Sequence, residues 1–499
     1  MKKILSGIGN TALTQVILRS VQLVVNALLA RILSPTDYGV VAFANIVIEL
    51  LYHMNSMGLQ TALIQVEPLR QETKNTSATL AFSLAIGAFV VAQACAPLAG
   101  ILLESQESVE VVRVLAFTFL LNPLGFLPVA LLTREMHFGK LRNAQVTGTV
   151  VRAVISVTLA LNGWKYWSLA IAHLAGIACT SVMLALQFPM RWKMQFDRGE
   201  ARRLLTIGVP LTLAALVTFG LMKADSFLIG TMLGQDYLGY YAIALLWATV
   251  TSTLMAEIVH LVLLPHFARL QSNPEALRAG LKRVLVPIGV FASVAAMSLF
   301  AVTDWFLMDI LGDGTDRWLP AGPVMRILCV YCVLRAVTET LDSPILAMGD
   351  TKLLLKSNLL AAVVAIALLP LSIPWLGLFG AGVVTTIAYA TQWAVFLPYL
   401  HRRLGLRFGE VVRALAPIVV ASALSVALAS LVPNEGGRTV FFAISPLEVT
   451  YAPSRLLAVA RVAIVCVSLI TIHELLTRGR LFREARAVLQ VLRPPQAAA

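Results

Sequence analysis

Fourteen apolar stretches, each about long enough to cross a lipid bilayer, occupy most of this 499-residue chain. A helix needs about 20 mostly apolar residues to span a membrane, and in the bilayer only helices and closed barrels satisfy every backbone hydrogen bond. The stretches therefore predict an all-α integral membrane protein with 14 transmembrane helices. They cover residues 11–30, 38–60, 77–101, 111–132, 145–163, 167–188, 206–230, 239–263, 284–303, 321–345, 358–376, 379–399, 414–432 and 456–476.

Charged residues make up only 13% of the chain, whereas soluble domains contain about 25%. This deficit excludes a soluble enzyme of this length. The net charge is +13, but the basic residues lie in short loops between apolar stretches, which is typical of a membrane protein. We therefore expect a lipid bilayer, and no nucleic acid, as a partner.

The basic residues also predict the orientation of the chain. If the N-terminus is cytoplasmic, 27 of the 39 Lys and Arg residues lie in cytoplasmic loops or tails and 5 lie in outer loops. Cytoplasmic loops are enriched in Lys and Arg, so we expect both termini in the cytoplasm. Polar residues interrupt the first apolar stretch, which we interpret as a retained helix rather than a cleaved signal peptide.

A weak internal repeat relates residues 26–44 to residues 226–244, with leucine, glycine and alanine shared at positions 200 residues apart. Each copy joins the first two helices of a six-helix unit, and both units begin in the cytoplasm, so the repeat is parallel. The expected organisation is an N-lobe at 1–190, a cytoplasmic linker at 191–204, a C-lobe at 205–400, and two further helices with a basic cytoplasmic tail at 401–499. No role is assigned to the outer loop at 433–455.

A polar stripe runs along the first predicted helix, where Gln15, Arg19, Gln22 and Asn26 recur at steps of four, three and four. This spacing places them on one helical face. An Arg at the centre of a membrane helix costs about 2.5–3.5 kcal/mol, so it is found where it faces water or binds another helix. The stripe contains no carboxylate to pair with Arg19, which favours a cavity. For Arg152, in a similar stripe at 145–156, both interpretations remain open.

Other titratable residues lie inside predicted helices. Lys223 is a further candidate for the cavity, and the candidates for ion coupling are Glu49, Asp225, Glu257 and His260. Arg335 and Glu339 are four residues apart, which favours mutual neutralisation over a role in binding. Intramembrane histidines, His173 included, more often donate hydrogen bonds between helices than bind ligands. The chain lacks a Walker-type loop, a nucleophile–base motif and metal-ligand spacing, so we expect no catalytic residue, no metal and no cofactor.

Three segments resemble polysaccharide flippases of the multidrug/oligosaccharidyl-lipid/polysaccharide (MOP) superfamily, in particular the WzxC-like branch. They are Ala30–Gly39 (ARILSPTDYG), Asp225–Gly234 (DSFLIGTMLG) and Leu264–Gln271 (LPHFARLQ). The resemblance implies a MATE-like pair of lobes around a central cavity. It also implies transport of a lipid-linked saccharide, of the undecaprenyl type, across the inner membrane of a bacterium. A polysaccharide polymerase would then be a further partner.

Two transport functions agree with the sequence. In a flippase, Arg19, Arg152 and Lys223 would attract an anionic headgroup, and Gln15, Gln22 and Asn26 would bind sugar hydroxyls. The alternative is a multidrug or organic-cation antiporter of the same superfamily, which would need a cavity dominated by carboxylates such as Glu49, Asp225 and Glu257. A membrane-embedded polymerase or acyltransferase is disfavoured because no large outer loop carries a catalytic dyad.

Overall fold

The computed structural model describes residues 18–187, 193–258, 263–431, 455–477 and 481, with the backbone alone at 251, 254–258, 455 and 456. Every regular element within these residues is a helix, as expected. The chain divides into two compact units, unit 1 at Met1–Ala242 and unit 2 at Ile243–Ala499. This boundary lies beyond the linker at 191–204, and the assignment of lobes stays a prediction.

Eleven of the described helices are long and apolar enough to span a membrane. The expected first span is described only from residue 18. The expected eighth span is α10 (Gln235–Ile258), of which some side chains are not described. The eleventh and twelfth spans lie together in α15 (Thr351–Leu404), on either side of Gly377 at φ 56° and ψ −138°. The all-helical membrane fold is confirmed, whereas the number of 14 spans remains a prediction.

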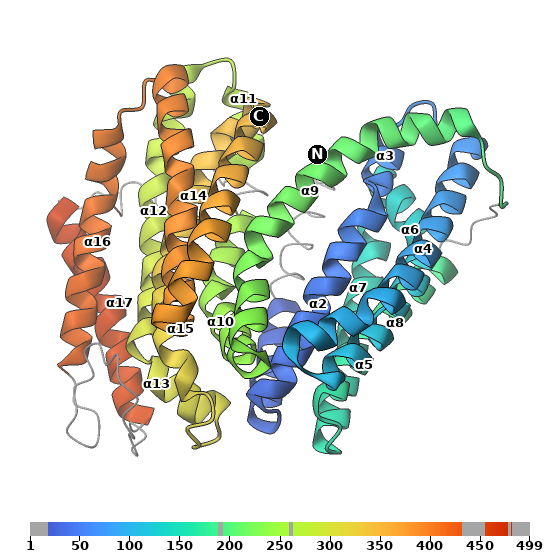
Figure 1. The fold of residues 1–499 in the computed structure, drawn as a ribbon. Coiled ribbons are helices and arrows are strands. Elements are labelled where there is room, and N and C mark those ends of the chain that lie inside the picture. Colours follow the sequence, from blue (N-terminus) through green and yellow to red (C-terminus); the bar gives the residue numbers. More distant parts are fainter. Residues whose placement is uncertain (1–17, 188–192, 259–262, 432–454, 478–480, 482–499) are drawn as a thin grey trace. The chain divides into compact units, whose positions relative to one another are not determined.

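The first described helix of unit 1 covers residues 18–32, and Figure 1 shows the helices that follow it. Its further helices are α2 (Pro35–Ser56), α3 (Leu59–Gln65), α4 (Gln71–Leu103), α5 (Gln106–Leu115), α6 (Phe117–Arg134), α7 (Phe138–Leu161), α8 (Lys165–Gln187) and α9 (Arg198–Leu233). The start of α2 is fixed locally, because Ser34 caps it, Pro35 opens it and Asp37 closes a capping box. Asp37 Oδ1 also accepts a hydrogen bond of 3.0 Å from the backbone N–H of Tyr166 in α8.

Leucines pack three of these helices together at the end of unit 1 away from the start of α2. Leu63 of α3, Leu131 of α6 and Leu204 of α9 belong to one buried cluster. The expected linker at 191–204 is only partly a linker, because α9 begins at Arg198 behind an Asp197 cap. The residues before it lie along α4, where Gln195 accepts a 3.0 Å hydrogen bond from the Asn75 side chain.

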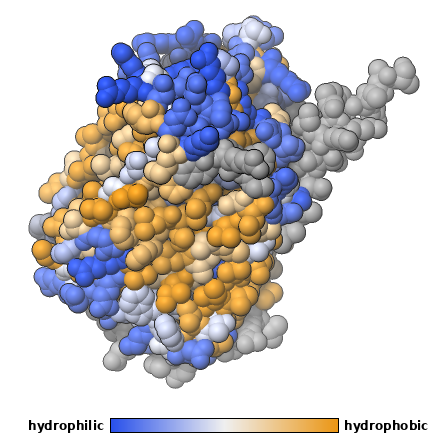
Figure 2. Space-filling model, turned by 90° about the vertical axis from the view of Figure 1, so that its right-hand side faces the viewer, coloured by the Kyte–Doolittle hydropathy of each residue, from blue (hydrophilic) through white to orange (hydrophobic). Residues whose placement is uncertain are grey.

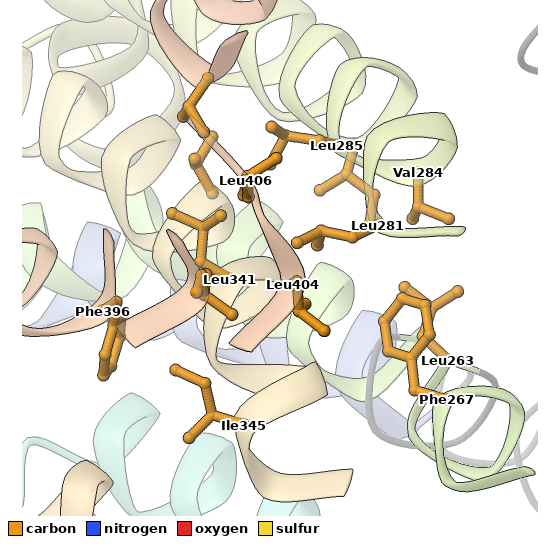
Figure 3. Packing of buried hydrophobic residues seen from close by; sticks show 14 of the residues in the cluster. Leu263, Phe267, Leu281, Val284, Leu285, Leu341, Ile345, Phe396, Leu404 and Leu406 are labelled. Carbon is orange, nitrogen blue, oxygen red and sulfur yellow. The ribbon is translucent and has the colours of Figure 1, made fainter. Parts of the chain in front are cut away.

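Unit 2 contains the remainder of α10 and a second set of helices. These are α11 (Leu264–Leu270), α12 (Pro274–Ala301), α13 (Thr303–Trp305), the π-helix η2 (Phe306–Leu311), the 3₁₀-helix η3 (Leu319–Ala321), α14 (Gly322–Ala347), α15, α16 (Phe408–Ser430) and α17 (Arg455–Thr477). A buried cluster joins α12, α14 and α15 through residues such as Leu281, Leu341 and Phe396 (Figure 3). Glu410 ties α16 to α12 by accepting hydrogen bonds from Arg278 at 2.8 Å and Lys282 at 2.5 Å.

Large apolar side chains are exposed along most of the long helices. On the face that Figure 2 shows, they form a broad hydrophobic band between hydrophilic ends. Soluble monomers rarely expose contiguous apolar patches larger than a few hundred Å². Together with the eleven candidate spans, the band marks a multi-pass membrane protein whose outer side chains contact lipid.

Candidate substrate-binding face

The helix at 18–32 has two exposed faces of opposite chemistry. Arg19 and Gln22 are exposed and Asn26 is half-buried on one side. Val24 and Leu28 are 60% and 45% exposed on the other. Leu28 follows Arg19 by nine residues, which is about two and a half turns and therefore the opposite side of the helix. The apolar face suits lipid, and the polar face does not.

Helix α7 repeats this division. Arg152 is exposed, and Val154 and Leu161 are 60% and 70% exposed. Leu161 again follows the Arg by nine residues, so the guanidinium emerges opposite the apolar face. Within the described residues Arg152 forms no ion pair with a carboxylate.

The two polar faces lie at the same height in unit 1. Leu29 of the first helix and Ala160 of α7 are buried in one small cluster, and both helices run in the same direction along the predicted membrane normal. Gln22 precedes Leu29 by seven residues and Arg152 precedes Ala160 by eight, which is about 10–12 Å along either axis. Arg19, Gln22 and Arg152 therefore fall within about one turn of each other in height. We call these residues, with Asn26, the cationic face.

Lys223 and Glu49 were expected to act separately, but they form an ion pair. Lys223 Nζ of α9 lies 2.9 Å from Glu49 Oε2 of α2, with the two side chains 34% and 46% exposed. One turn further along α2, the His53 ring lies 5.5 Å from the ring of Phe219. No local sequence pattern reveals such a pair, because its members lie 174 residues apart. Lys223 is thus a charge that Glu49 compensates.

Asp225 is buried near the end of α9. It is only 5% exposed and accepts a 2.5 Å hydrogen bond from the hydroxyl of Tyr241 in α10. The backbone N–H of Ser226 donates to its other oxygen at 2.6 Å. These contacts fix the α9–α10 junction.

Three expected site residues lie outside the described side chains: Gln15, Glu257 and His260. The predicted neutralisation of Arg335 by Glu339 is confirmed, because Nε of the arginine lies 2.8 Å from the carboxylate. In the part of the chain that the structure describes, no three His, Cys, Asp or Glu residues are grouped to hold a metal ion.

The helices define a class, namely multi-pass membrane proteins, and their fold resembles those of two solved transporters. The lipid II flippase MurJ in its inward closed conformation has a TM-score of 0.71 at 12% identity, over 93% of this chain and 98% of that one. An inward-facing MATE multidrug transporter has a TM-score of 0.63 at 16% identity, over 79% of this chain and 98% of that one.

The chain belongs to the polysaccharide biosynthesis protein family, whose pattern matches residues 28–323. The lipopolysaccharide biosynthesis protein WzxC of Escherichia coli K12 is 24% identical over 72% of either chain. The teichuronic acid biosynthesis protein TuaB of Bacillus subtilis is 23% identical, over 70% of this chain and 73% of that protein. The succinoglycan biosynthesis transport protein ExoT of Rhizobium meliloti is 26% identical over 66% of each. The expected family is confirmed.

Proposed function

We propose that this protein is a flippase that moves lipid-linked oligosaccharide units across the bacterial cytoplasmic membrane by alternating access. Its relatives are named for lipopolysaccharide, teichuronic acid and succinoglycan biosynthesis, and its fold resembles that of a lipid II flippase. Both termini lie in the cytoplasm in this proposal. The lipid carrier is of the undecaprenyl type, and a polysaccharide polymerase receives the exported unit.

The observation that carries the proposal is the cationic face. Arg19 and Arg152 emerge opposite the lipid-facing sides of their helices, on two neighbouring helices at one height. A guanidinium in hydrocarbon costs several kcal/mol, so this face borders water. A guanidinium fork binds phosphate oxygens in pairs. In this proposal the amides of Gln15, Gln22 and Asn26 bind sugar hydroxyls.

The antiporter alternative needs carboxylates that are available to an organic cation. Two of its three candidates are engaged in the structure: Glu49 with Lys223 at 2.9 Å and Asp225 with Tyr241 at 2.5 Å. This favours the flippase. Glu257 and His260 remain our proposed coupling residues. The membrane potential also helps outward movement of an anionic headgroup, by about 2.3 kcal/mol per charge per 100 mV.

The test is polysaccharide export in the source bacterium with its own copy of the gene deleted. Because binding of phosphate uses both arms of the guanidinium, we expect Arg19→Lys to weaken export and Arg19→Ala to abolish most of it, at unchanged abundance in the membrane. Arg198→Ala, an exposed arginine at the start of α9, is the matched control and should export normally. Full export by Arg19→Ala at normal abundance would remove Arg19 from the site.

A further inference from the structure

Helices α7 and α8 cross at two glycines. A Cβ on Gly148 would lie 1.9 Å from Thr180 Oγ1, so the helices meet closely there. A Cβ on Gly176 would lie 3.0 Å from Cβ and 3.7 Å from Cδ of Arg152. The stem of Arg152 therefore passes over the bare backbone of α8 at Gly176, and this contact restricts where the guanidinium reaches.

His173 lies three residues before Gly176, on the same side of α8. Its ring is half-buried and lies within electrostatic reach of the Arg152 guanidinium. The expectation that such a histidine bonds to another helix is wrong for the described residues, where His173 has no hydrogen-bond partner. Neither His173 nor Arg152 is paired with a carboxylate in the same part of the chain.

His173 and Arg152 thus lie on the facing sides of α8 and α7, and neither pairs with a carboxylate in the described part of the chain. A cation and a ring N–H in this arrangement form a receptor for an anion. A bidentate guanidinium occupies two oxygens of its ligand. In a carboxylate both oxygens are then engaged and a further donor must share one of them, whereas a phosphate presents a third oxygen to a further donor. The imidazole provides that donor.

We propose that His173 and Arg152 together bind a phosphate group of the lipid-linked substrate, and that His173 gives selectivity for phosphate over the carboxylates of acidic sugars. This rests on the proposed function and deepens it. Arg152 provides the charge and the fork, and Gly176 keeps the space for its stem. His173 adds a hydrogen bond to the third oxygen.

The experiment measures ligand binding to the purified full-length protein in lipid nanodiscs. The probes are farnesyl diphosphate as a lipid diphosphate, farnesol as its neutral counterpart, inorganic diphosphate as a free anion, and glucuronate as a carboxylate sugar. His173→Leu removes the donor, and we expect it to raise the Kd for farnesyl diphosphate about tenfold, the effect of one lost hydrogen bond to a charged group. The Kd for glucuronate should not change.

Further variants separate binding from folding. His173→Gln retains an N–H donor and should keep most of the affinity, while thermal unfolding shows that both variants are folded. His137→Leu changes an exposed histidine that pairs with Glu135 and should bind like the wild type. Gly176→Leu should displace Arg152 and weaken binding, whereas Gly87→Leu, where a Cβ meets no atom within 4 Å, should not.

The outcomes distinguish this proposal from the function on which it rests. Displacement of farnesyl diphosphate by inorganic diphosphate would show recognition of the headgroup and support the site. An unchanged Kd in His173→Leu, or equal displacement by glucuronate, would overturn the role of His173 and leave the flippase standing. If the wild type bound farnesol as tightly as farnesyl diphosphate, the lipid-linked phosphate itself would be excluded as the substrate class.

Discussion

Gly39 and Gly239 make reciprocal contacts at the starts of α2 and α10. A Cβ on Gly39 would lie 1.8 Å from the carbonyl oxygen of Gln235, and a Cβ on Gly239 would lie 1.8 Å from that of Pro35. Beside them, Thr36 donates a 2.6 Å hydrogen bond to Asp236, 200 residues further along the chain. Such pairwise exchange is the geometry of two segments related by a two-fold axis. It supports the predicted repeat and explains why both copies carry glycine.

We expect Gly39→Ala and Gly239→Ala to be strongly destabilising, and by similar amounts. A methyl group cannot lie 1.8 Å from a carbonyl oxygen, so the two helix starts must separate. Overpacking of this kind costs about 1–3 kcal/mol or more. Thermal unfolding in detergent measures the effect, with Gly87→Ala as the control in open space. A wild-type Tm for Gly39→Ala would show that the helices do not meet here.

Tyr241→Phe should destabilise the α9–α10 junction. The substitution removes the 2.5 Å hydrogen bond to the buried carboxylate of Asp225, and loss of a hydrogen bond to a charged group costs about 1–3 kcal/mol. Tyr237→Phe is the matched control, because that ring is 47% exposed. Equal unfolding temperatures for the two variants would argue against the hydrogen bond.

Reversal of the Glu49–Lys223 pair should be tolerated. Both side chains are partly exposed, so the pair contributes at most about 1 kcal/mol. We expect Lys223→Glu alone to place two carboxylates together and to lower the Tm. The double variant Glu49→Lys/Lys223→Glu should recover most of the loss in the same unfolding assay. No recovery would mean that the two residues do not interact.

Local patterns predicted the helices well. Apolar length predicted the two spans at 358–376 and 379–399, which α15 contains on either side of Gly377. The spacing of Arg19, Gln22 and Asn26 predicted one polar face. These features depend on helix period and backbone chemistry, which neighbouring residues determine. The start of α9 inside the expected linker was missed, because Asp197 as a cap gave only a weak signal.

Contacts between distant helices could not be predicted. The sequence showed Glu49 and Lys223 as intramembrane charges, but only the packing of α2 on α9 reveals that they neutralise each other. The same holds for Asp225 with Tyr241 and for Arg152, whose stem packs on α8 at Gly176. An ion pair or hydrogen bond depends on which helix faces meet, and single-helix periodicity does not contain that information.

The orientation in the membrane is tested by reporter fusions in short connections. We expect fusions at Ser105 and Gly314 to report the outer side and fusions at Arg198 and Gly349 to report the cytoplasm, because Lys and Arg concentrate in cytoplasmic loops. An outer signal at Arg198 would overturn the expected topology, since it would require an odd number of crossings before α9.

The central claim is that the cationic face moves an anionic lipid headgroup across the membrane. The most direct measurement is flipping of a fluorescent lipid-linked oligosaccharide by the purified protein in proteoliposomes. We expect the wild type to flip this lipid. The double variant Arg19→Gln/Arg152→Gln should flip it at least about tenfold more slowly at equal protein incorporation, because each substitution removes a charge-assisted contact. Arg198→Gln should flip at the wild-type rate. Wild-type flipping by the double variant would contradict the claim, as would wild-type protein that transports an organic cation but not the lipid-linked saccharide.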